Sequence, residues 1–352
     1  MKEIRLLLIL FIAIMLNSCA GKKNFSIGSK KTIHFEKEYA VTGEHLNIDS
    51  IGVYKALVLD RYLIVETYQQ NCFAKIYDLK SLNHLGDFLC RGQGPADVLR
   101  ARLEYAKSPY LYIEDGGQRC IKIVKIFETT DDGSKRLSVS VTNTLKYWDS
   151  GFEDPEKALY VNDTLLWVKS YDAMNEEMIY YCRYNPVTKE ISDKIALYNY
   201  PVTPDIKYKA MIVLFDFIKP DGSKIVLTTG CLDQLDIYNL AEPDKSISVT
   251  QNDYLIDYEY LKQENLDNVK DFYFAQPYCS DKLISALYRN HAKNTVELHI
   301  IDWDGNPVCK LILDRKLKSA TIDFDAGFMY GVSEMEDRVY RYDIGDILKE
   351  AY

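Results

Sequence analysis

Short apolar and aromatic segments, separated by turn-forming residues, recur along the chain from residue 31 onward. Only DYEYLKQENL (257–266) has the pattern of a short helix, which excludes an architecture that alternates strands with helices. Between the apolar segments lie tight-turn sequences such as PDG, DDGS, WDGN and AEPD. The segments with the length and composition of strands are YLIVETY (62–68), FAKIYDL (73–79), LLWVKSY (165–171), KIVLTTG (224–230), QLDIYNL (234–240), VELHIID (296–302) and RVYRYDI (338–344).

These strands belong to a longer unit, in which an apolar strand and a polar turn are followed by a strand that ends on Asp or Asn. The unit ends at Asp78, Asn185, Asn239, Asp302 and Asp343, and a further copy that lacks the acid ends near Lys125. The spacing is close to the length of a four-stranded propeller blade. We therefore predict an all-β fold, a six-bladed β-propeller, with another large β-sandwich or a solenoid as the alternative.

Closure of the ring is also expected from the pattern. The last unit, from about residue 320, contains three strands, whereas a propeller closes without an exposed sheet edge. The N-terminal segment TIHFEKEY (32–39) is strand-like, and we predict that it adds the missing outer strand of the last blade.

The first residues are separable from the propeller. Lys2 and Arg5 precede an apolar run, residues 6–16, that has the length of a signal-peptide core and is too short for a stable membrane-spanning helix. LNSC, which ends at Cys19, resembles the bacterial lipobox, whose cysteine is lipidated and anchors the protein to a membrane, although Asn17 departs from the usual small or aliphatic residue. We predict a signal peptide at 1–18, a lipidated tether at 19–30 and the propeller at 31–352; the alternative is a plain secretory signal with an incidental cysteine.

The residues after Cys19 indicate where such a lipoprotein would be sorted. Ala20 stands where an aspartate would resemble an inner-membrane retention signal, so the outer membrane is favoured. The following GKKNFS lacks the acidic run that resembles a surface-export tag in Bacteroidetes-type lipoproteins. The expected location is therefore the periplasmic face of the outer membrane.

Composition and charge narrow the function classes. The 352 residues carry a net charge of −9, which disfavours nucleic acid because phosphate contacts need a basic face. Tyrosine is frequent, with 28 copies against 13 of phenylalanine, and suits strands with one apolar and one hydrated face. The seven cysteines after Cys19 form no CxxC pair, so we expect buried strand cysteines with one or two disulfides rather than a zinc site, and at least one unpaired thiol.

One stretch carries a family resemblance. Residues 92–127, GQGPADVLRARLEYAKSPYLYIEDGGQRCIKIVKIF, resemble the NHL-type propeller repeat, which runs GxGPGxF, a strand, and then YVADxxNxRIxVF. Asp97 and the absence of a following phenylalanine depart from that pattern, and YGVSEMEDRVYRYD (330–343) repeats its second half. With the lipobox, the chain resembles the six-bladed TolB-like propeller lipoproteins of Bacteroidetes. The matching residues are Gly92, Gly94, Pro95, Tyr112, Asp115, Arg119, Ile121 and Ile123.

The glycine-rich segment LCRGQGPADVLRAR (89–102) has two interpretations. We predict that it connects the outer strand of the first blade to the inner strand of the second, where glycines permit positive φ and Pro95 stiffens the turn. The alternative is a nest of backbone N–H groups around a phosphate, although no P-loop Lys-Ser/Thr pair follows.

The arginines of this segment are candidate ligand-binding residues. Arginines cluster here in an otherwise acidic chain, and one that lines the central channel would bind a carboxylate or phosphate through two hydrogen bonds. The alternative is that they pair with acids such as Glu104, Glu114 or Asp115. The low-ranked ligand-binding set is Arg91, Arg100, Arg102 and Asp115.

Two functions follow. The first is a monomeric binding or scaffold module without a cofactor, which takes an envelope protein, a small ligand or a glycan on its loop faces. The second is a hydrolytic enzyme similar to the lactonase propellers, with Ca²⁺ in the channel as a Lewis acid. No GxSxG elbow or EF-hand ladder occurs, and the five histidines have no catalytic spacing, so binding is favoured. The calcium ligands would come from Glu66, Asp115, Asp172, Asn175 and Glu334.

Overall fold

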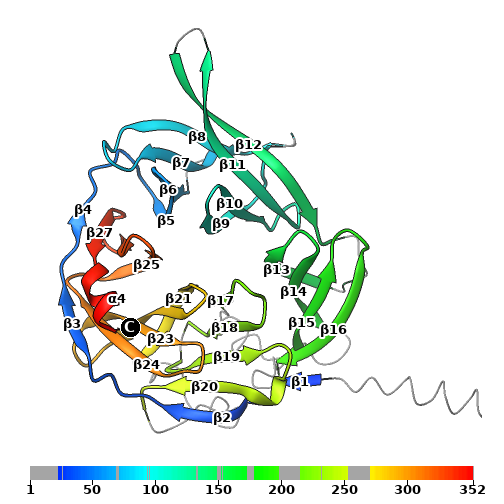
Figure 1. Cartoon of the computed structure of the whole chain (residues 1–352), viewed down its shortest axis with the longest axis vertical. Coiled ribbons are helices and arrows are strands. Elements are labelled where there is room, and N and C mark those ends of the chain that lie inside the picture. The colour runs from blue at the N-terminus through cyan, green and yellow to red at the C-terminus, as the bar shows by residue number, and fades with distance from the viewer. Residues whose placement is uncertain are drawn as a thin grey trace, which may run out of the picture.

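The computed structural model describes residues 23–25, 27–68, 71–92, 94, 96–131, 134–148, 152, 154–172, 178–197, 215–230, 232–252 and 270–351. Its strands form six sheets that are arranged as blades in a ring around a central channel (Figure 1). The predicted all-β, six-bladed propeller is therefore confirmed. The helix expected at 257–266 lies outside the described residues.

Each blade begins with the strand nearest the channel and proceeds outward. Blade 1 contains β5 (Val53–Leu59), β6 (Tyr62–Thr67), β7 (Cys72–Asp78) and β8 (His84–Cys90). Blade 2 contains β9 (Ala101–Lys107), β10 (Tyr110–Asp115), β11 (Cys120–Asp131) and β12 (Ser134–Lys146). Blade 3 contains β13 (Asp154–Asn162), β14 (Leu165–Asp172), β15 (Met178–Asn185) and β16 (Glu190–Leu197).

The second half of the ring follows the same order. Blade 4 contains β17 (Phe215–Ile218), β18 (Lys224–Thr228), β19 (Leu235–Asn239) and β20 (Ser246–Thr250). Blade 5 contains β21 (Phe272–Cys279), β22 (Leu283–Asn290), β23 (Thr295–Asp302) and β24 (Pro307–Leu313). Blade 6 contains β25 (Leu317–Asp323), β26 (Phe328–Ser333) and β27 (Val339–Asp343). Described helix is confined to η1 (Pro243–Lys245) and α4 (Gly345–Ala351).

The repeated Asp or Asn of the sequence ends the third strand of a blade. Asp78, for example, accepts the backbone N–H of Ser81 at 2.8 Å, and Asn239 accepts that of Glu242 at 2.9 Å. Such side-chain acceptors turn the chain back towards the fourth strand. Blade 2 has Lys125 at this point, and β11 continues to Asp131 in a long hairpin with β12 that projects from the ring (Figure 1).

Apolar side chains join neighbouring blades. Leu57 and Ile64 of blade 1 pack with Leu103 and Ile113 of blade 2, and similar clusters join other pairs of blades. All six residues of β6 are buried because both faces of the strand contact a neighbouring blade. The core is therefore distributed between the blades, which leaves the inner strands free to line the channel.

The N-terminal segment runs along the outer edges of four consecutive blades. Strands β1 (Lys23–Phe25), β2 (Ile27–Thr32) and β3 (Glu38–Val41) pair in parallel with β16, β20 and β24. Strand β4 (Glu44–His45) then pairs antiparallel with β27 and completes blade 6. We call β1 to β4 the N-terminal strap (Figure 1).

The strap confirms closure by an N-terminal strand, but the predicted segment was wrong. Residues 32–39 contribute to the edges of blades 4 and 5, whereas Glu44–His45 closes blade 6. Blade 6 is the neighbour of blade 1, so only residues just before β5 can reach its edge. Strand β1 and part of β2 fall within the segment predicted as a tether, 19–30.

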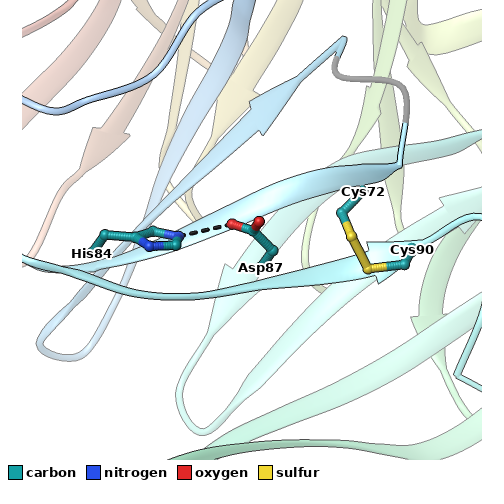
Figure 2. Close-up of a disulfide and its surroundings, with 4 residues drawn as sticks. All are labelled: Cys72, His84, Asp87 and Cys90. Carbon is teal, nitrogen blue, oxygen red and sulfur yellow. Dashed lines mark hydrogen bonds and ion pairs between the residues drawn. A yellow bond between two sulfur atoms is a disulfide. The ribbon is translucent and has the colours of Figure 1, made fainter.

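A disulfide links the two outer strands of blade 1. Cys72 on β7 lies opposite Cys90 on β8, close to an ion pair between His84 and Asp87 (Figure 2). Cys120, Cys182, Cys279 and Cys309 are buried free thiols. The expectation of buried strand cysteines with a disulfide is confirmed, while Cys231 lies outside the described residues.

Candidate functional site in the central channel

The glycine-rich loop connects β8 of blade 1 to β9 of blade 2, as predicted. Gly92 and Gly94 do not use the positive φ that glycine permits. These glycines instead leave room for the Asp97 carboxylate, which accepts the Gly94 N–H at 2.8 Å and would clash with a Cβ at Gly92. The protein's own carboxylate thus takes the place that a phosphate would take in a nest, and the loop serves as a structural connection.

The candidate ligand-binding residues lie in different surroundings. Arg91 is exposed and its guanidinium lies 4.8 Å from the centre of the Phe73 ring. Arg100 is also exposed and its side chain covers Gly116. Asp115 is completely buried, and its carboxylate accepts four backbone N–H groups at 3.0 to 3.1 Å, from Leu99, Arg100, Gly117 and Gln118. Asp115 therefore fixes the loop, and it does not lie beside a shared ligand position with the arginines.

Arg102 alone of this set lines the channel. It lies on the inner strand β9, is exposed, and its guanidinium forms no hydrogen bond or ion pair with any described residue. Burial acts to lower the pKa of Arg102, but the carboxylates of Glu114 and Glu104 outweigh it and raise that pKa above its usual value. Arg102 therefore stays charged and available to a ligand.

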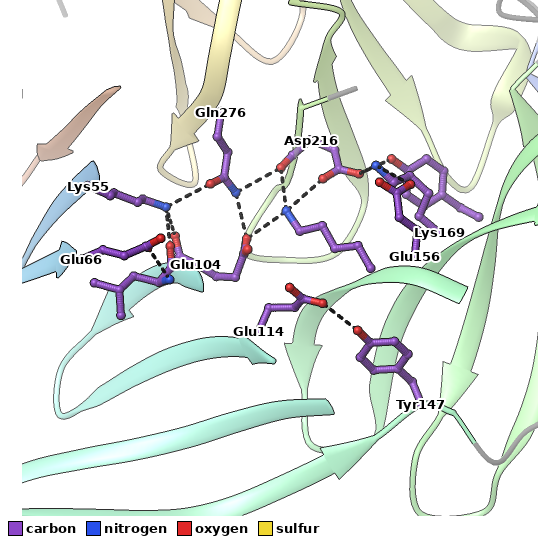
Figure 3. Close-up of polar contacts among 12 residues, drawn as sticks. Lys55, Glu66, Glu104, Glu114, Tyr147, Glu156, Lys169, Asp216 and Gln276 are labelled. Atoms are coloured by element: carbon purple, nitrogen blue, oxygen red, sulfur yellow. Dashed lines mark hydrogen bonds and ion pairs between the residues drawn. The ribbon is translucent and has the colours of Figure 1, made fainter. Parts of the chain in front are cut away.

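Residues from all six blades surround Arg102, many of them with charged side chains. We call this part of the channel the charged segment; it encloses a small cavity of about 60 Å³. Most of its charged residues, though not Arg102, form a network of contacts with one amide across the channel (Figure 3). The charged residues and the amide of the segment are Lys55 and Glu66 of blade 1, Arg102 and Glu104 of blade 2, Glu156, Lys157 and Lys169 of blade 3, Asp216 of blade 4, Gln276 of blade 5 and Lys318 of blade 6.

Asp216 is the most strongly held carboxylate of the network. It is 1% exposed and lies 3.0 Å from the Lys157 ammonium and 3.2 Å from that of Lys169. The Tyr181 hydroxyl also donates to it at 2.6 Å. Burial acts to raise the pKa of Asp216, but Lys157 and Lys169 outweigh it and hold that pKa well below its usual range.

A second branch of the network joins blades 1, 2 and 5. The Lys55 ammonium donates to the carbonyl oxygen of Glu104 at 2.9 Å and to the amide oxygen of Gln276 at 3.0 Å. The Gln276 amide donates in turn to the Glu104 carboxylate at 2.8 Å, which also lies 3.0 Å from the Lys157 ammonium. Burial lowers the pKa of Lys55 to about 8.

Two buried carboxyl groups lack a lysine partner. Glu66 accepts the backbone N–H of Leu103 at 2.8 Å, and Glu114 accepts the Tyr147 hydroxyl at 2.7 Å. Burial raises the pKa of each to about 7. These two groups therefore titrate near neutral pH.

The three predicted calcium ligands whose side chains are described have different surroundings. Glu66 lies in the charged segment, Asp115 is held by the loop, and Glu334 pairs with Arg289 at 3.0 Å. The side chains of Asp172 and Asn175 lie outside the described residues. Among the residues that are described, no group of three or more His, Cys, Asp or Glu side chains is arranged to hold a metal ion.

The opposite end of the channel is wide and aromatic. The same six inner strands end around an open cavity of about 700 Å³, which we call the bowl. The Tyr105 and Tyr112 rings stack with centres 4.3 Å apart, and the Tyr160 ring lies 4.5 Å from that of Tyr112. The aromatic lining residues are Tyr105, Tyr110, Tyr112, Tyr160, Phe217, Tyr278 and Phe324. Tyr278 contacts both the bowl and the charged segment and so lies between them.

Sequence analysis missed most of this site. Lys55 and Asp216 are the single charged residues of the apolar inner strands VYKALVL and FDFI, and Lys157 precedes the apolar part of DPEKALYVN. A charge at this position in the first strand of successive units was the available signal. It was not recognised because the inner strands of blades 3 and 4 were not delimited in the sequence.

Comparison with known proteins identifies no family for this chain. No protein-family model and no curated protein matches the sequence. Similar solved structures include hydrazine synthase of Kuenenia stuttgartiensis, with a TM-score of 0.48, 11% identity, and coverage of 85% of this chain and 97% of that one. A Bacteroides fragilis protein described as exported has a TM-score of 0.46 and 11% identity over 91% and 98% of the two chains. The β-propeller domain of Myceliophteria thermophila Cps50 (Swd1) has a TM-score of 0.41 and 11% identity over 86% and 99%.

The protein is therefore an all-β, six-bladed propeller, a fold consistent with a binding or scaffold module. At the identities given, the likeness to other structures concerns the fold alone. Within the described residues, no helix is long and apolar enough to span a membrane.

Proposed function

We propose that the protein is a monomeric, lipid-anchored envelope binding module that takes an anionic group, a carboxylate or a phosphate, at Arg102 in the charged segment of the channel. The observation that carries this proposal is the Arg102 guanidinium, which lines the cavity, is exposed, and forms no hydrogen bond or ion pair with a described residue. A planar guanidinium binds both oxygens of such a group through two parallel hydrogen bonds.

The lysines around Arg102 already have partners and therefore do not compete with it for an anion. Lys55 donates to three acceptors, and Lys157 is held by Glu104 and Asp216. Lys318 at the edge of the cavity pairs with Asp337. These lysines are therefore already occupied, and the anion would be recognised mainly by Arg102.

The carboxylates of the charged segment favour binding over calcium-dependent hydrolysis. Asp216 and Glu104 are neutralised by lysines, while Glu66 accepts a backbone N–H and has a raised pKa. A calcium site needs several carboxylate or carbonyl oxygens directed at one point. We therefore propose a module without a cofactor.

The proposed location is the periplasmic face of the outer membrane, with lipid on Cys19. The lipobox at 16–19 supports the anchor, and the disulfide between Cys72 and Cys90 supports an oxidising compartment. A Cys19→Ala variant should then leave the membrane fraction and appear as soluble protein in the periplasm. Membrane retention of this variant, after washing with high salt, would count against the anchor.

The anion site is tested by titrating inorganic phosphate and citrate into the protein by isothermal calorimetry. Arg102→Gln should weaken binding of the preferred anion at least tenfold, because a charge-assisted pair of hydrogen bonds is lost. Arg100→Gln is the matched control: it removes an exposed arginine two residues away that does not line the cavity, and it should leave affinity unchanged. Equal loss in both variants, or no binding by the unmodified protein, would refute the site.

Bound metal, measured after dialysis against Ca²⁺, distinguishes the calcium-dependent enzyme from the binding module. One calcium ion per chain, retained through gel filtration, would favour the hydrolytic enzyme. It would also direct attention to lactone and phosphoester substrates.

A further inference from the structure

The bowl has the size and lining of a ligand site, and nothing in the proposed anion site uses it. Its volume of about 700 Å³ lies within the range of small-molecule pockets. Tyr105, Tyr112 and Tyr160 form a continuous aromatic wall, and Phe217 extends it with its ring centre 6.0 Å from that of Tyr105. Burial raises the pKa of Tyr105, Tyr112 and Tyr160, so the wall remains uncharged near neutral pH.

The rim of the bowl is acidic. Its charged lining residues are four aspartates, Asp60, Asp281, Asp323 and Asp325, and one lysine, Lys107. Asp323 accepts the backbone N–H of Ala326 at 2.9 Å. The side chains of the other three aspartates are exposed and form no hydrogen bond or ion pair with a described residue. An excess of negative charge without ion-pair partners among the described residues therefore lines the same cavity as the aromatic wall.

We infer that the bowl binds a small organic cation, with an ammonium or guanidinium group held between the tyrosine wall and the aspartate rim. Aromatic faces attract cations through their quadrupoles, and the attraction is strongest where the cation has lost water. The negative carboxylates also attract cations and raise their local concentration in the bowl. The same rim repels anions, so the bowl and the Arg102 site select ligands of opposite charge.

The inference is independent of the proposed anion site. Arg102 lies at the start of β9, whereas Tyr105 and Lys107 lie at its end. Among the described residues, Tyr278 is the one that lines both the bowl and the charged segment, and it carries no charge there. Failure of one site would leave the other untouched.

The test uses choline and its neutral isostere 3,3-dimethylbutan-1-ol, titrated by saturation-transfer difference NMR. The two probes share their shape and hydroxyl group and differ in the charge of the quaternary centre. We expect saturable choline binding in the millimolar range and at least tenfold weaker binding of the neutral isostere. No saturable choline binding, or equal binding of both probes, would overturn the inference.

A charge-removing triple variant, D60N/D281N/D325N, should weaken choline binding at least fivefold. The charge-conserving variant D60E/D281E/D325E is its matched control and should stay within about twofold of the unmodified protein. All three positions are exposed, so both variants should keep the original melting temperature. If the glutamate and asparagine variants lose choline equally, the carboxylate charge is not the determinant and the inference fails. Saturable binding of maltotriose without a preference for choline would also overturn it, in favour of a neutral glycan site.

Discussion

The two ends of the channel are built from the same six inner strands, yet they differ in how their charged side chains are paired. In the charged segment, buried ions such as Asp216, Lys157 and Lys169 are paired with each other. In the bowl, Asp60, Asp281 and Asp325 form no hydrogen bond or ion pair with another described residue. The difference follows from access to water: a charge that leaves water must be neutralised by another charge, whereas at a wide opening the solvent itself stabilises it.

The comparison also separates the charged groups that hold the blades together from those that are available to bind a ligand. The paired charges hold five blades together across the channel through Lys55, Glu104, Lys157, Asp216 and Gln276. The unpaired groups, Arg102 at one end and the rim aspartates at the other, contribute little to such contacts and are available to ligands. Removing a group of the first kind should cost stability, and removing one of the second kind should cost affinity.

The largest effect is expected from Asp216→Asn. Loss of this carboxylate leaves two buried lysines with one partner fewer each, and breaking a buried ion pair typically costs about 3 to 5 kcal/mol. The free energy of unfolding, measured with urea, should fall by this amount. Asp325→Asn at the exposed rim is the control and should change it by less than about 0.5 kcal/mol. Equal stability of the two variants would show that the paired charges of the charged segment stabilise the fold no more than the rim aspartates of the bowl do.

A pH-dependent effect on stability is expected from Glu66 in the charged segment. Because burial raises the pKa of Glu66 from 4.5 to about 7, the folded protein binds this proton more tightly than the unfolded chain. The free energy of unfolding should therefore fall as pH rises from about 4.5 to 7 and stay lower above it. Glu66→Gln cannot ionise, and it should recover about 1 to 3 kcal/mol at pH 8 relative to the unmodified protein.

The measurement is a series of urea titrations from pH 5 to pH 8. Asp281→Asn, at the exposed rim, should follow the curve of the unmodified protein. A Glu66→Gln curve parallel to that of the unmodified protein would show that this group does not titrate in the window.

The two ligand sites should respond independently. The anion affinity of the D60N/D281N/D325N variant should stay within about twofold of the unmodified protein, and so should the choline affinity of Arg102→Gln. Sites without shared charged partners behave additively. Titration of each probe in both variants measures this. A reciprocal change larger than about tenfold would indicate coupling through the residues between the two ends, such as Tyr278.

The smallest effect is that of salt. Raising ionic strength from about 0.05 to 0.5 M should weaken both probes severalfold because exposed charges are screened. The stability difference between Asp216→Asn and the unmodified protein should change little, since buried pairs are screened much less. Urea titrations and probe titrations at the two salt concentrations check this contrast. An Asp216 effect that disappears in high salt would place that carboxylate in contact with solvent.

The parts of this fold that could be predicted are those with a local physical cause. In five of the six blades an Asp or Asn ends the third strand and forms its turn with residues two to four positions on, so the repeat was visible in the sequence. The closing strand was misplaced because strand propensity alone does not say which blade edge a segment will meet. The ion network was not visible because its contacts join distant residues, such as Lys55 and Gln276, 221 positions apart.

The role of Arg102 could be predicted from the sequence only in part. Its place on an inner strand was predicted from the order of strands in a blade. Arg91 and Arg100 belong to the same arginine-rich segment, however, and they do not line the cavity of the channel. Asp115 was grouped with them because it is an acid close to arginines. Its structural role is the binding of four backbone N–H groups, which depends on how the loop before β9 folds back onto it.

The N-terminal strap has a consequence for the order in which the protein matures. Lys23 is synthesised before its partner Ile195, which follows 172 positions later, and the partners of β2, β3 and β4 follow later still. Until these partner strands have been made, the strap has no edge with which to pair. It can join the ring only after blades 3 to 6 exist, so their outer edges are covered by residues that were made before them.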